Sequence, residues 1–469
     1  MIDVVVVGGG ISGLAAARRL SLVGLSVLLV ESSPRLGGKI AGVRLGDLTV
    51  DGGAESVLVR RPEAPALIDE LGLHDRLVHP TDAKPQVYVD GRAVELPPSA
   101  LGVPADLEAL AGLLTPAGLD RALREPSLPA PPLSDDVPIG LLLDERFGPE
   151  VTDRLLEPLL GGVYAGQSRR LSFRAVSGAL FATAQAGGAL SGHAAQLRRP
   201  GDGPVFGGLD GGIVALVETL VRSLAVRGVP VRTSTTVREL AATTDGYRLT
   251  VGSTREPQQV TARAVVLATP AAATGRLLSG LVASASRFGA IPYASMAVAA
   301  LAVRGVQPVG SGLLVPPGQL PTVKAVTHSS TKWGWLRDRV SDAWDADVHA
   351  VRASVGRLGE ERLLQVGDTE LIERTVAELR ELPGWSGVEV VESALQRWGG
   401  GLPQYEVGHT DLVARLRDEL VGRRGLAVCG AAYDGVGIAA CLGSADVAVN
   451  KITRDLGSTR DPAVVGVGA

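Results

Sequence analysis

The chain has few cysteines and no long apolar runs, and these two absences exclude whole classes of protein. Only Cys429 and Cys441 occur among 469 residues, too few for a disulfide framework, so we interpret both as buried free thiols. The longest apolar stretches are interrupted by Gly, Arg or Pro well before the roughly 20 residues of a transmembrane helix. No basic segment precedes the first apolar run, so we predict no secretory signal and expect a cytoplasmic protein.

An excess of positive charge is also absent, because the formal net charge is −4 at pH 7. Neither nucleic acid nor an anionic membrane is therefore favoured as a bulk partner. The six histidines lack the spacing of metal ligands, so we predict no metal site. The sequence also lacks a Ser/His/Asp arrangement and paired carboxylates for acid–base catalysis. With 45% hydrophobic residues, the chain is expected to form a globular protein of two or three domains.

The most informative segment, 2–31, has the pattern of a strand, a glycine-rich turn, a helix, a second strand and an acidic residue. In its GxGxxG motif, Gly8 permits a tight turn, Gly10 lets the backbone approach a pyrophosphate, and Gly13 lets the helix pack closely on the strand. The free N–H groups and the dipole of the helix favour an anion. Glu31 can accept hydrogen bonds from a ribose. This pattern predicts a Rossmann-like, dinucleotide-binding α/β unit.

The rest of the chain predicts a substrate-binding domain and a helical insertion, placed between separated segments of the nucleotide-binding domain. We assign 1–75, 204–275 and 395–469 to the nucleotide-binding domain, 76–97 and 276–394 to a mixed α+β substrate-binding domain, and 98–203 to a mainly helical insertion. Residue patterns within these segments predict a hairpin over 87–96, a helix over 150–160 and a strand over 324–330. A strand over 264–267 is expected to return to the first sheet.

A second motif, of the form acid–x3–R–x–G–G–K, begins at Glu31 and ends at Lys39. It resembles the second signature of a flavoprotein superfamily that includes amine oxidases, phytoene desaturases and protoporphyrinogen oxidases. DGGAES at 51–56 resembles the next flavin-contacting turn of that superfamily. GAAYDGVGIAAC at 430–441 resembles the segment that closes on the pyrophosphate and isoalloxazine. NAD would need only the first motif, so the three motifs together favour FAD.

Within the superfamily, a series of strings narrows the resemblance. GAESVLVRRPEA, LPPSALGVP, EPLLGGVYAG, GSGLLVPP, KAVTHSSTKW, VRASVGR, RWGGGLPQYEVGH and CGAAYDGVGIAAC occur in this order. Together they resemble the protoporphyrinogen/coproporphyrinogen oxidase family of haem biosynthesis, from about residue 2 to 450. Monoamine oxidases match less well, because they need an aromatic cage beside the flavin and only Tyr433 lies near the C-terminal turn. In relatives the helical insertion is apolar and faces a membrane, so peripheral contact with the inner face of a membrane stays open here.

The resemblance implies tight, non-covalent FAD binding by residues near the three motifs and in two later segments. Carried over by position, these residues are Gly8, Gly9, Gly10, Ile11, Ser12, Gly13, Glu31, Ser32, Lys39, Gly53, Ala54, Glu55, Ser56, Val237, Trp398, Val436, Gly437 and Ile438. Val237 is expected to pair with the adenine through its backbone, and the alternative is a core valine. Trp398 is expected to form an aromatic wall beside the flavin, and the alternative is an ordinary buried tryptophan.

The resemblance also implies the reaction, a six-electron oxidation of a porphyrinogen that uses oxygen three times and releases hydrogen peroxide. Because the product gains aromaticity, the protein need not supply a strong acid or base, and the cofactor carries the redox step. Gly162 resembles a family glycine whose carbonyl faces the ring, which makes it the candidate catalytic position. A turn glycine is the alternative.

Four cations are candidate ligands for the propionate carboxylates, namely Arg60, Arg61, Lys324 and Lys332, and solvated surface charge is the alternative for each. With the resemblance to the soluble bacterial branch, they favour coproporphyrinogen III as substrate and hand-over of the product to other haem-pathway enzymes. The alternatives are a protoporphyrinogen IX oxidase, a flavin amine oxidase or carotenoid desaturase, and a non-enzymatic escort protein.

Overall fold

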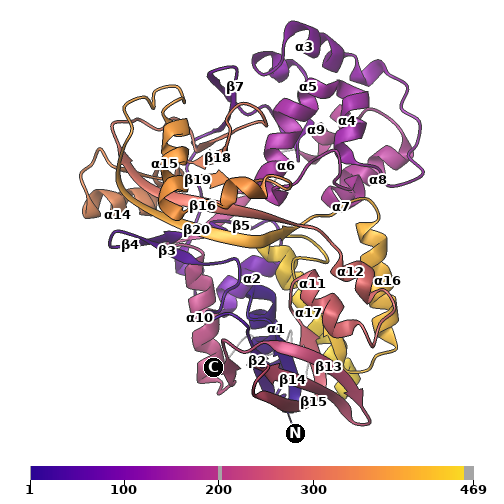
Figure 1. The fold of residues 1–469 in the computed structure, drawn as a ribbon. Helices are drawn as coiled ribbons and strands as arrows, with labels where there is room; N and C mark the ends of the chain where they lie inside the picture. Colours follow the sequence, from indigo (N-terminus) through magenta and orange to yellow (C-terminus); the bar gives the residue numbers. More distant parts are fainter. Residues whose placement is uncertain (1, 199–202, 459–469) are drawn as a thin grey trace.

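Two seven-stranded sheets organise the molecule, one in the lower half and one in the upper half of Figure 1. This computed structural model describes residues 2–198 and 203–458. Parallel strands and helices alternate around the lower sheet, so the α/β class expected from the sequence is confirmed.

The lower sheet, called the central sheet below, has the order β12-β2-β1-β15-β14-β13, and β21 also pairs with β15. Its strands are β1 (Ile2–Val7), β2 (Val27–Val30), β12 (Val231–Arg232), β13 (Val237–Thr243), β14 (Gly246–Gly252), β15 (Pro257–Leu267) and β21 (Leu426–Val428). β1 runs parallel to both β2 and β15. Val4 and Val6 pack into the core on one face, and Val5 and Val7 pack into the core on the other. Burial on both faces explains the uninterrupted valine run.

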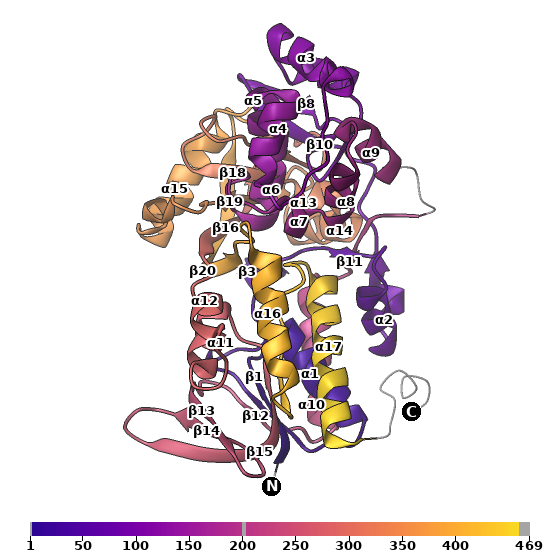
Figure 2. The ribbon, with the colours of Figure 1, turned by 90° about the vertical axis from the view of Figure 1, so that its right-hand side faces the viewer.

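Helices cover both faces of the central sheet. One face carries α1 (Ile11–Leu22), α10 (Val214–Val226) and α17 (Ile438–Leu456). α1 packs against both of the others, and α17 stands in front of them in Figure 2. The other face carries α11 (Ala271–Leu278), α12 (Ala285–Gly289) and α16 (His409–Val421). This layering leaves the carboxyl ends of the parallel strands pointing toward the upper half of the molecule, where the second sheet lies.

The second sheet has the order β20-β16-β19-β18-β17-β7-β8 and is mainly antiparallel. Its strands are β7 (Pro85–Val89), β8 (Arg92–Glu95), β16 (Tyr293–Arg304), β17 (Gly312–Leu314), β18 (Val323–Thr327), β19 (His349–Val355) and β20 (Glu389–Pro403). α15 (Asp368–Leu379) covers one face. The other face packs against α13 (Ser329–Lys332), α14 (Gly334–Ala343) and the hairpin of β3 (Gly42–Leu45) and β4 (Leu48–Asp51).

A lobe of short helices forms the top of the molecule and has its own hydrophobic core (Figure 1). Its helices are η2 (Glu108–Gly112), α3 (Pro116–Leu123), η3 (Glu125–Ser127), α4 (Ile139–Phe147), α5 (Pro149–Val151), η4 (Thr152–Leu156), α6 (Glu157–Tyr164), α7 (Phe173–Val176), α8 (Gly178–Ala186) and α9 (Leu190–Leu197). Val87 and Val89 of β7 join this core, so the lobe packs on the end of the second sheet. The helical character expected for this part of the chain is therefore observed.

Short elements connect these larger parts. They are β5 (Val57–Leu58), α2 (Glu63–Glu70), η1 (His74–Arg76), β6 (Leu77–Val78), β9 (Ser99–Ala100), β10 (Val103–Pro104), β11 (Phe206–Leu209) and η5 (Glu361–Leu364). β11 pairs with both β5 and β6 in a small antiparallel sheet. In the described part of the chain, no helix is both long enough and apolar enough to cross a bilayer.

The helix expected over 150–160 is confirmed, because α5, the π-helical turn η4 and α6 follow one another without a gap. Pro158 lies in the first turn of α6 and has no N–H to donate to the carbonyl of Arg154, which accounts for the π-helical turn. One expected element differs from the structure. The strand expected over 324–330 ends at Thr327, because the His328 ring turns inward onto Trp385 and a helical turn follows. The hairpin of β7 and β8 and the returning strand β15 are confirmed, and the six domain boundaries stay predictions.

Candidate functional site

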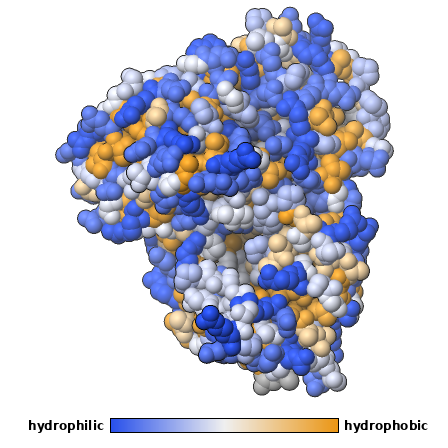
Figure 3. Space-filling view, viewed as in Figure 1, coloured by the Kyte–Doolittle hydropathy of each residue, from blue (hydrophilic) through white to orange (hydrophobic). Residues whose placement is uncertain are grey.

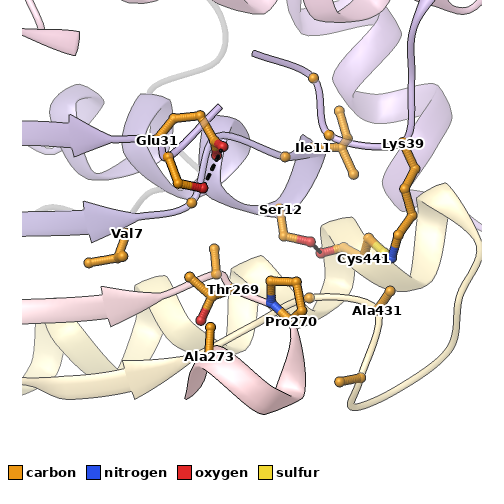
Figure 4. Close-up of a pocket in the computed structure, with 18 of the residues that line it drawn as sticks. Val7, Ile11, Ser12, Glu31, Lys39, Thr269, Pro270, Ala273, Ala431 and Cys441 are labelled. Carbon is orange, nitrogen blue, oxygen red and sulfur yellow. Dashed lines mark hydrogen bonds between the residues drawn. The ribbon is translucent and has the colours of Figure 1, made fainter. Parts of the chain in front are cut away.

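A cavity of about 330 Å³ lies at the carboxyl edge of the central sheet. Val7 at the end of β1, Val30 at the end of β2 and Ala268 just after β15 line it. Figure 4 shows these strands entering from one side and the helix that carries Cys441 facing them. Ligands of open α/β sheets bind at this edge, because the loops that leave the strands diverge there.

The three motif glycines serve different purposes at this cavity. Gly8 has a φ of +107°, and a Cβ there would lie 2.5 Å from the carbonyl oxygen of Ala268. A Cβ at Gly13 would overlap the carbonyl oxygen of Gly8, so the helix could not approach the strand. A Cβ at Gly10 would meet only the Cα of Gly38, at 3.9 Å, and Gly10 lines the cavity. The chain therefore needs Gly8 and Gly13 for its own packing, whereas Gly10 leaves space for a ligand.

Two helix N-termini converge on this space. α1 begins after Gly10 and α17 begins after Gly437, and neither helix has a side-chain cap or an acidic residue in its first turn. The hydroxyl of Ser12 donates a 3.0 Å hydrogen bond to the carbonyl of Cys441, which ties the two first turns together. Uncapped N–H groups and two aligned dipoles make this junction a site for an anion such as a pyrophosphate.

The Glu31 carboxylate lies at the same edge and holds the glycine loop. Its Oε2 accepts a 2.6 Å hydrogen bond from the Gly9 N–H, and its Oε1 accepts one of 2.7 Å from the Ser33 N–H. Glu31 also lines the cavity (Figure 4), where its carboxylate can accept hydrogen bonds from a ligand hydroxyl.

The Lys39 side chain extends toward Cys441, as Figure 4 shows, and both residues line the cavity. The ammonium of Lys39 lies 5.7 Å from the centre of the Tyr293 ring, and burial lowers the pKa of this lysine. Burial raises the pKa of the Cys441 thiol, which keeps the thiol protonated. Both cysteines are buried and free, as the sequence predicts.

The turn over 51–56 reaches the cavity through Ala54 and is held from the second sheet. Arg352 on β19 donates 2.6 Å and 2.5 Å hydrogen bonds to the Glu55 carboxylate and the Gly53 carbonyl. Lys332 donates a 2.5 Å hydrogen bond to the other oxygen of Glu55. Burial alone would raise the pKa of Glu55, but the two cations outweigh it and bring the pKa to about 2. The indole N–H of Trp398 adds a 2.9 Å hydrogen bond to the carbonyl of Gly52, just before this clamp.

The structure brings many of the predicted cofactor residues together at the cavity, and their contacts with the cofactor stay predictions. The predicted residues that line the cavity are Gly8, Gly10, Ile11, Ser12, Glu31, Ser32, Lys39, Ala54, Val237, Val436 and Ile438. The predicted residues outside the lining are Gly9, Gly13, Gly53, Glu55, Ser56, Trp398 and Gly437. Several of the second group support the first: Gly13 permits helix packing, and Glu55 and Trp398 hold the turn that carries Ala54.

Sequence reasoning missed a second set of cavity residues. They are Thr235, Thr236, Thr269, Pro270, Arg276, Leu277 and Tyr293. Thr269 and Pro270 could have been found, because they follow the strand that pairs with β1 and must end at the same edge. Tyr293 has no such signal. It comes from the second sheet, and its hydroxyl accepts a 2.9 Å hydrogen bond from the Ala271 N–H.

The four predicted carboxylate ligands lie outside the cavity lining, and their contacts with a substrate stay predictions. Arg60 is exposed and donates a 3.1 Å hydrogen bond to the Gly203 carbonyl, and Arg61 is paired with Glu63. Lys324 is buried with its Nζ 3.3 Å from the Gly161 carbonyl, and burial lowers the pKa of this lysine to about 7. Lys332 is held by Glu55 as described above. Of the four, the two arginines are therefore the more accessible.

Gly162, the candidate catalytic position, lies in α6 on the side of the second sheet. A Cβ there would touch only the Cδ2 of Leu314, at 3.8 Å, and the next residue, Val163, is 44% exposed. Gly166 of the same motif has a structural reason instead, because a Cβ there would overlap the side-chain oxygen of Gln404.

The surface is hollowed where the upper and lower halves of the molecule meet (Figure 3).

Comparison with known proteins identifies the family. Residues 11–453 match the family model described as flavin containing amine oxidoreductase. The coproporphyrinogen III oxidase of Mycobacterium tuberculosis is 38% identical over 96% of this chain and 97% of its own length. Human protoporphyrinogen oxidase is 31% identical over 94% of this chain and 96% of its own length.

A solved structure agrees with these sequence matches. An Exiguobacterium protein assigned as a protoporphyrinogen oxidase superposes with a TM-score of 0.82 at 28% identity, covering 97% of this chain and 99% of that protein. The family model spans the clamp on the 51–56 turn, the α17 N-terminus and the cavity-lining residues from Ile11 onward, and it begins just after Val7, Gly8 and Gly10. The chain therefore belongs to the flavin-containing amine oxidoreductase family.

Proposed function

We propose that this protein binds FAD in the cavity and oxidises coproporphyrinogen III to coproporphyrin III in haem biosynthesis. The observation that carries the proposal is 38% identity to a coproporphyrinogen III oxidase across 96% of the chain. The cavity supports it, because two uncapped helix N-termini meet beside Gly10 at the edge where dinucleotides bind.

The residues of the cavity fit FAD by their chemistry. The junction of α1 and α17 suits the pyrophosphate, with the Lys39 ammonium as a nearby cation. Glu31 offers acceptor oxygens for the ribose, and Val237, which lines the cavity, is proposed to contact the adenine through its backbone. Bound FAD would supply the hydride acceptor for a meso carbon of the porphyrinogen. The task left to the chain is to place the substrate beside the cofactor and to exclude water.

The overall reaction balances without a metal or a strong base. A porphyrinogen and three oxygen molecules give a porphyrin and three molecules of hydrogen peroxide, with two electrons transferred in each of three rounds. Gly162 is proposed to orient the pyrrole N–H groups through its carbonyl, because a helix position without a side chain leaves room for a flat ring. Oxygen as acceptor, a cytoplasmic location with peripheral membrane contact, and hand-over to other haem-pathway enzymes are parts of the same proposal.

Coproporphyrinogen III is preferred to protoporphyrinogen IX because it carries four propionates and protoporphyrinogen IX carries two. Arg60 and Arg61 are the accessible cations among the proposed carboxylate ligands. Lys324 and Lys332 are engaged inside the protein and are the weaker candidates. Human protoporphyrinogen oxidase is also similar over most of the chain, so oxidation of protoporphyrinogen IX is the second candidate.

The deciding experiment compares the two porphyrinogens side by side by product fluorescence, with peroxide measured in the same vessel. We expect yellow protein that releases FAD on heating, a higher kcat/KM for coproporphyrinogen III, and no loss of turnover with a chelator. Equal or greater efficiency with protoporphyrinogen IX would select the second candidate. Rapid flavin reduction by amines alone would identify an amine oxidase, and colourless protein that cannot be reconstituted would identify an escort protein.

A further inference from the structure

The segment over 430–437 forms one wall of the cavity and has little regular structure of its own. Gly430, Ala431, Ala432 and Val436 line the cavity from this segment, and Figure 4 shows Ala431 facing it. The segment connects β21 to α17, so its conformation places the α17 N-terminus. Whatever fixes this segment therefore fixes the cavity wall.

One side-chain oxygen closes the segment. The Tyr405 hydroxyl donates a 2.5 Å hydrogen bond to the carbonyl of Ala431 and accepts a 3.0 Å hydrogen bond from the N–H of Gly435. Tyr405 is 2% exposed, so water cannot readily replace either bond. Ala431 and Gly435 lie before and after Tyr433 in the sequence, so the hydroxyl connects the two halves of the segment.

The Tyr405 ring is itself fixed by its neighbours. It stacks on His409 with ring centres 4.0 Å apart and an interplanar angle of 13°, and lies 5.6 Å from the Tyr164 ring. Burial lowers the pKa of His409 to about 4, which leaves that ring neutral at physiological pH. Burial raises the pKa of Tyr405, so its hydroxyl keeps the proton that it donates.

The same stretch of chain also holds the helical lobe. Gln404 donates a 2.8 Å hydrogen bond to the carbonyl of Tyr164, the last residue of α6. Residues 404 and 405 thus contact both the helix that carries Gly162 and the cavity wall. A single dipeptide at the end of β20 connects the proposed substrate side to the proposed cofactor side.

Other contacts keep the segment folded without making this closure. Arg417 pairs with Asp434 at 2.8 Å and 2.5 Å, and the Gly430 N–H donates a 3.2 Å hydrogen bond to the Ser444 hydroxyl. The Tyr433 ring stacks on Phe288. These contacts anchor the ends and the tip of the segment, so removing one hydroxyl should loosen the wall without unfolding it.

We propose that Tyr405 is a positioning residue whose hydroxyl holds the 430–437 segment in place against the bound cofactor, while the neighbouring Gln404 connects this position to α6. The proposal rests on the proposed function, since it requires FAD in this cavity. It assigns Tyr405 a role that needs no contact with FAD or substrate.

The test compares Tyr405→Phe with Tyr247→Phe. Tyr247 is the control, because it is also a buried tyrosine and its hydroxyl donates a 2.9 Å hydrogen bond to the carbonyl of Arg424 at the far end of the central sheet. Each variant is purified as holoenzyme, and the FAD dissociation constant, visible flavin spectrum, Tm, kcat and KM are measured. Tyr405→Phe is expected to weaken FAD binding by about tenfold and to change the flavin spectrum, because two buried backbone groups lose their partner. Both variants are expected to lower Tm, because each loses hydrogen bonds of a tyrosine hydroxyl. Only Tyr247→Phe is expected to keep the wild-type FAD affinity and flavin spectrum.

The outcomes separate this proposal from the proposed function. Wild-type affinity and spectrum in Tyr405→Phe would overturn the positioning role and leave FAD binding intact. Wild-type protein that retains no flavin after reconstitution would instead remove the proposed function. If Tyr405→Phe does not fold, hydrogen exchange of the wild-type holoenzyme decides: slow exchange at the Gly435 amide supports the proposal, and exchange at the rate of an exposed amide overturns it.

Discussion

The hydroxyl of Ser12 donates a 3.0 Å hydrogen bond to the carbonyl of Cys441, and this contact joins helices whose first turns are 429 residues apart in the chain. Because both residues line the cavity, the junction of α1 and α17 is where a ligand would meet the two free helix ends. The glycines around it divide into those that the chain needs for packing and one that leaves room. Substitution at these positions can therefore separate cofactor binding from folding.

The replacement Gly10→Ala is expected to abolish FAD binding while preserving the fold. Gly10 has a φ of −72° and a ψ of 177°, which alanine adopts without strain, and its Cβ would meet only Gly38 at 3.9 Å. The methyl group would occupy the space in which a pyrophosphate approaches the backbone. Flavin released by acid should fall by at least about tenfold per chain, whereas the Tm of the apoprotein should match the wild type.

The matched control for this prediction is Gly13→Ala. Its Cβ would overlap the Gly8 carbonyl, so this variant should lose stability whether or not FAD is present. A Gly10→Ala protein that retains its full flavin content would contradict a pyrophosphate at this position.

The replacement Lys324→Met is expected to stabilise the protein most at and below neutral pH. Burial lowers the pKa of Lys324 to about 7, so the folded state disfavours the charged amine. Between pH 7 and about 10.4 the unfolded chain holds more protons at this site than the folded chain, and the free energy of unfolding rises with pH. Below pH 7 both states are protonated and the full burial penalty remains. Methionine removes the charge and should flatten this pH dependence in urea titrations between pH 6.5 and 9.5.

The exposed Lys84 provides the control, since Lys84→Met changes the same charge at a surface position. An identical slope of stability against pH for wild type and Lys324→Met would show that Lys324 does not carry the dependence. A parallel shift in both variants would assign the effect to net charge instead.

The replacement Gly162→Ala is expected to stabilise the helix and to reduce porphyrinogen turnover. Alanine is favoured over glycine in a helix by about 1 kcal/mol, and the added Cβ would touch only Leu314 at 3.8 Å. A loss of activity without a loss of stability would then report a clash with the substrate. The measurements are Tm and kcat/KM for coproporphyrinogen III, and the expected fall in kcat/KM is about tenfold.

Gly192 offers the matched control, because it lies inside α9, is exposed and has no atom within 4 Å of an added Cβ. Gly192→Ala should raise Tm similarly and leave kcat/KM unchanged. Full activity in Gly162→Ala would make Gly162 an ordinary helix residue and remove it from the site.

The glycine motifs could be predicted because local sterics dictate them. Gly8 needs a positive φ and Gly13 needs contact with a carbonyl, and both requirements arise within a few residues of chain. The buried strand β1 could be predicted equally well from its valine run, because burial on both faces of the sheet favours apolar residues at every position. These local requirements define the edge of the central sheet where the cavity lies.

The clamp on the 51–56 turn could not be predicted in the same way. Glu55 pairs with Lys332 and Arg352, which lie 277 and 297 residues further along the chain, and only the packed fold brings them together. From the sequence, Lys332 is either a ligand of a substrate carboxylate or a solvated surface charge, and neither interpretation contains its pair with Glu55. Tyr293 could not be predicted as a cavity residue for a similar reason, since a strand of the second sheet has no local pattern that marks its first residue as part of the cavity.

The replacement Arg61→Ala is expected to reduce the preference for coproporphyrinogen III. A charge-assisted contact with a carboxylate contributes about 1.5–3 kcal/mol, so kcat/KM for coproporphyrinogen III should fall by about tenfold or more. Protoporphyrinogen IX has two fewer propionates, so its kcat/KM should fall less.

Arg61 is paired with Glu63 in the substrate-free protein, and a propionate must compete with that carboxylate. The variant Glu63→Gln therefore serves as the counterpart, because it weakens the pair and should preserve or raise kcat/KM for coproporphyrinogen III. Added salt should reduce the difference between the two substrates in the wild type, since Arg61 is partly exposed and its field is screened. Equal losses for both porphyrinogens in Arg61→Ala, with no effect of Glu63→Gln, would show that Arg61 does not read the propionates and would leave Arg60 as the remaining exposed candidate.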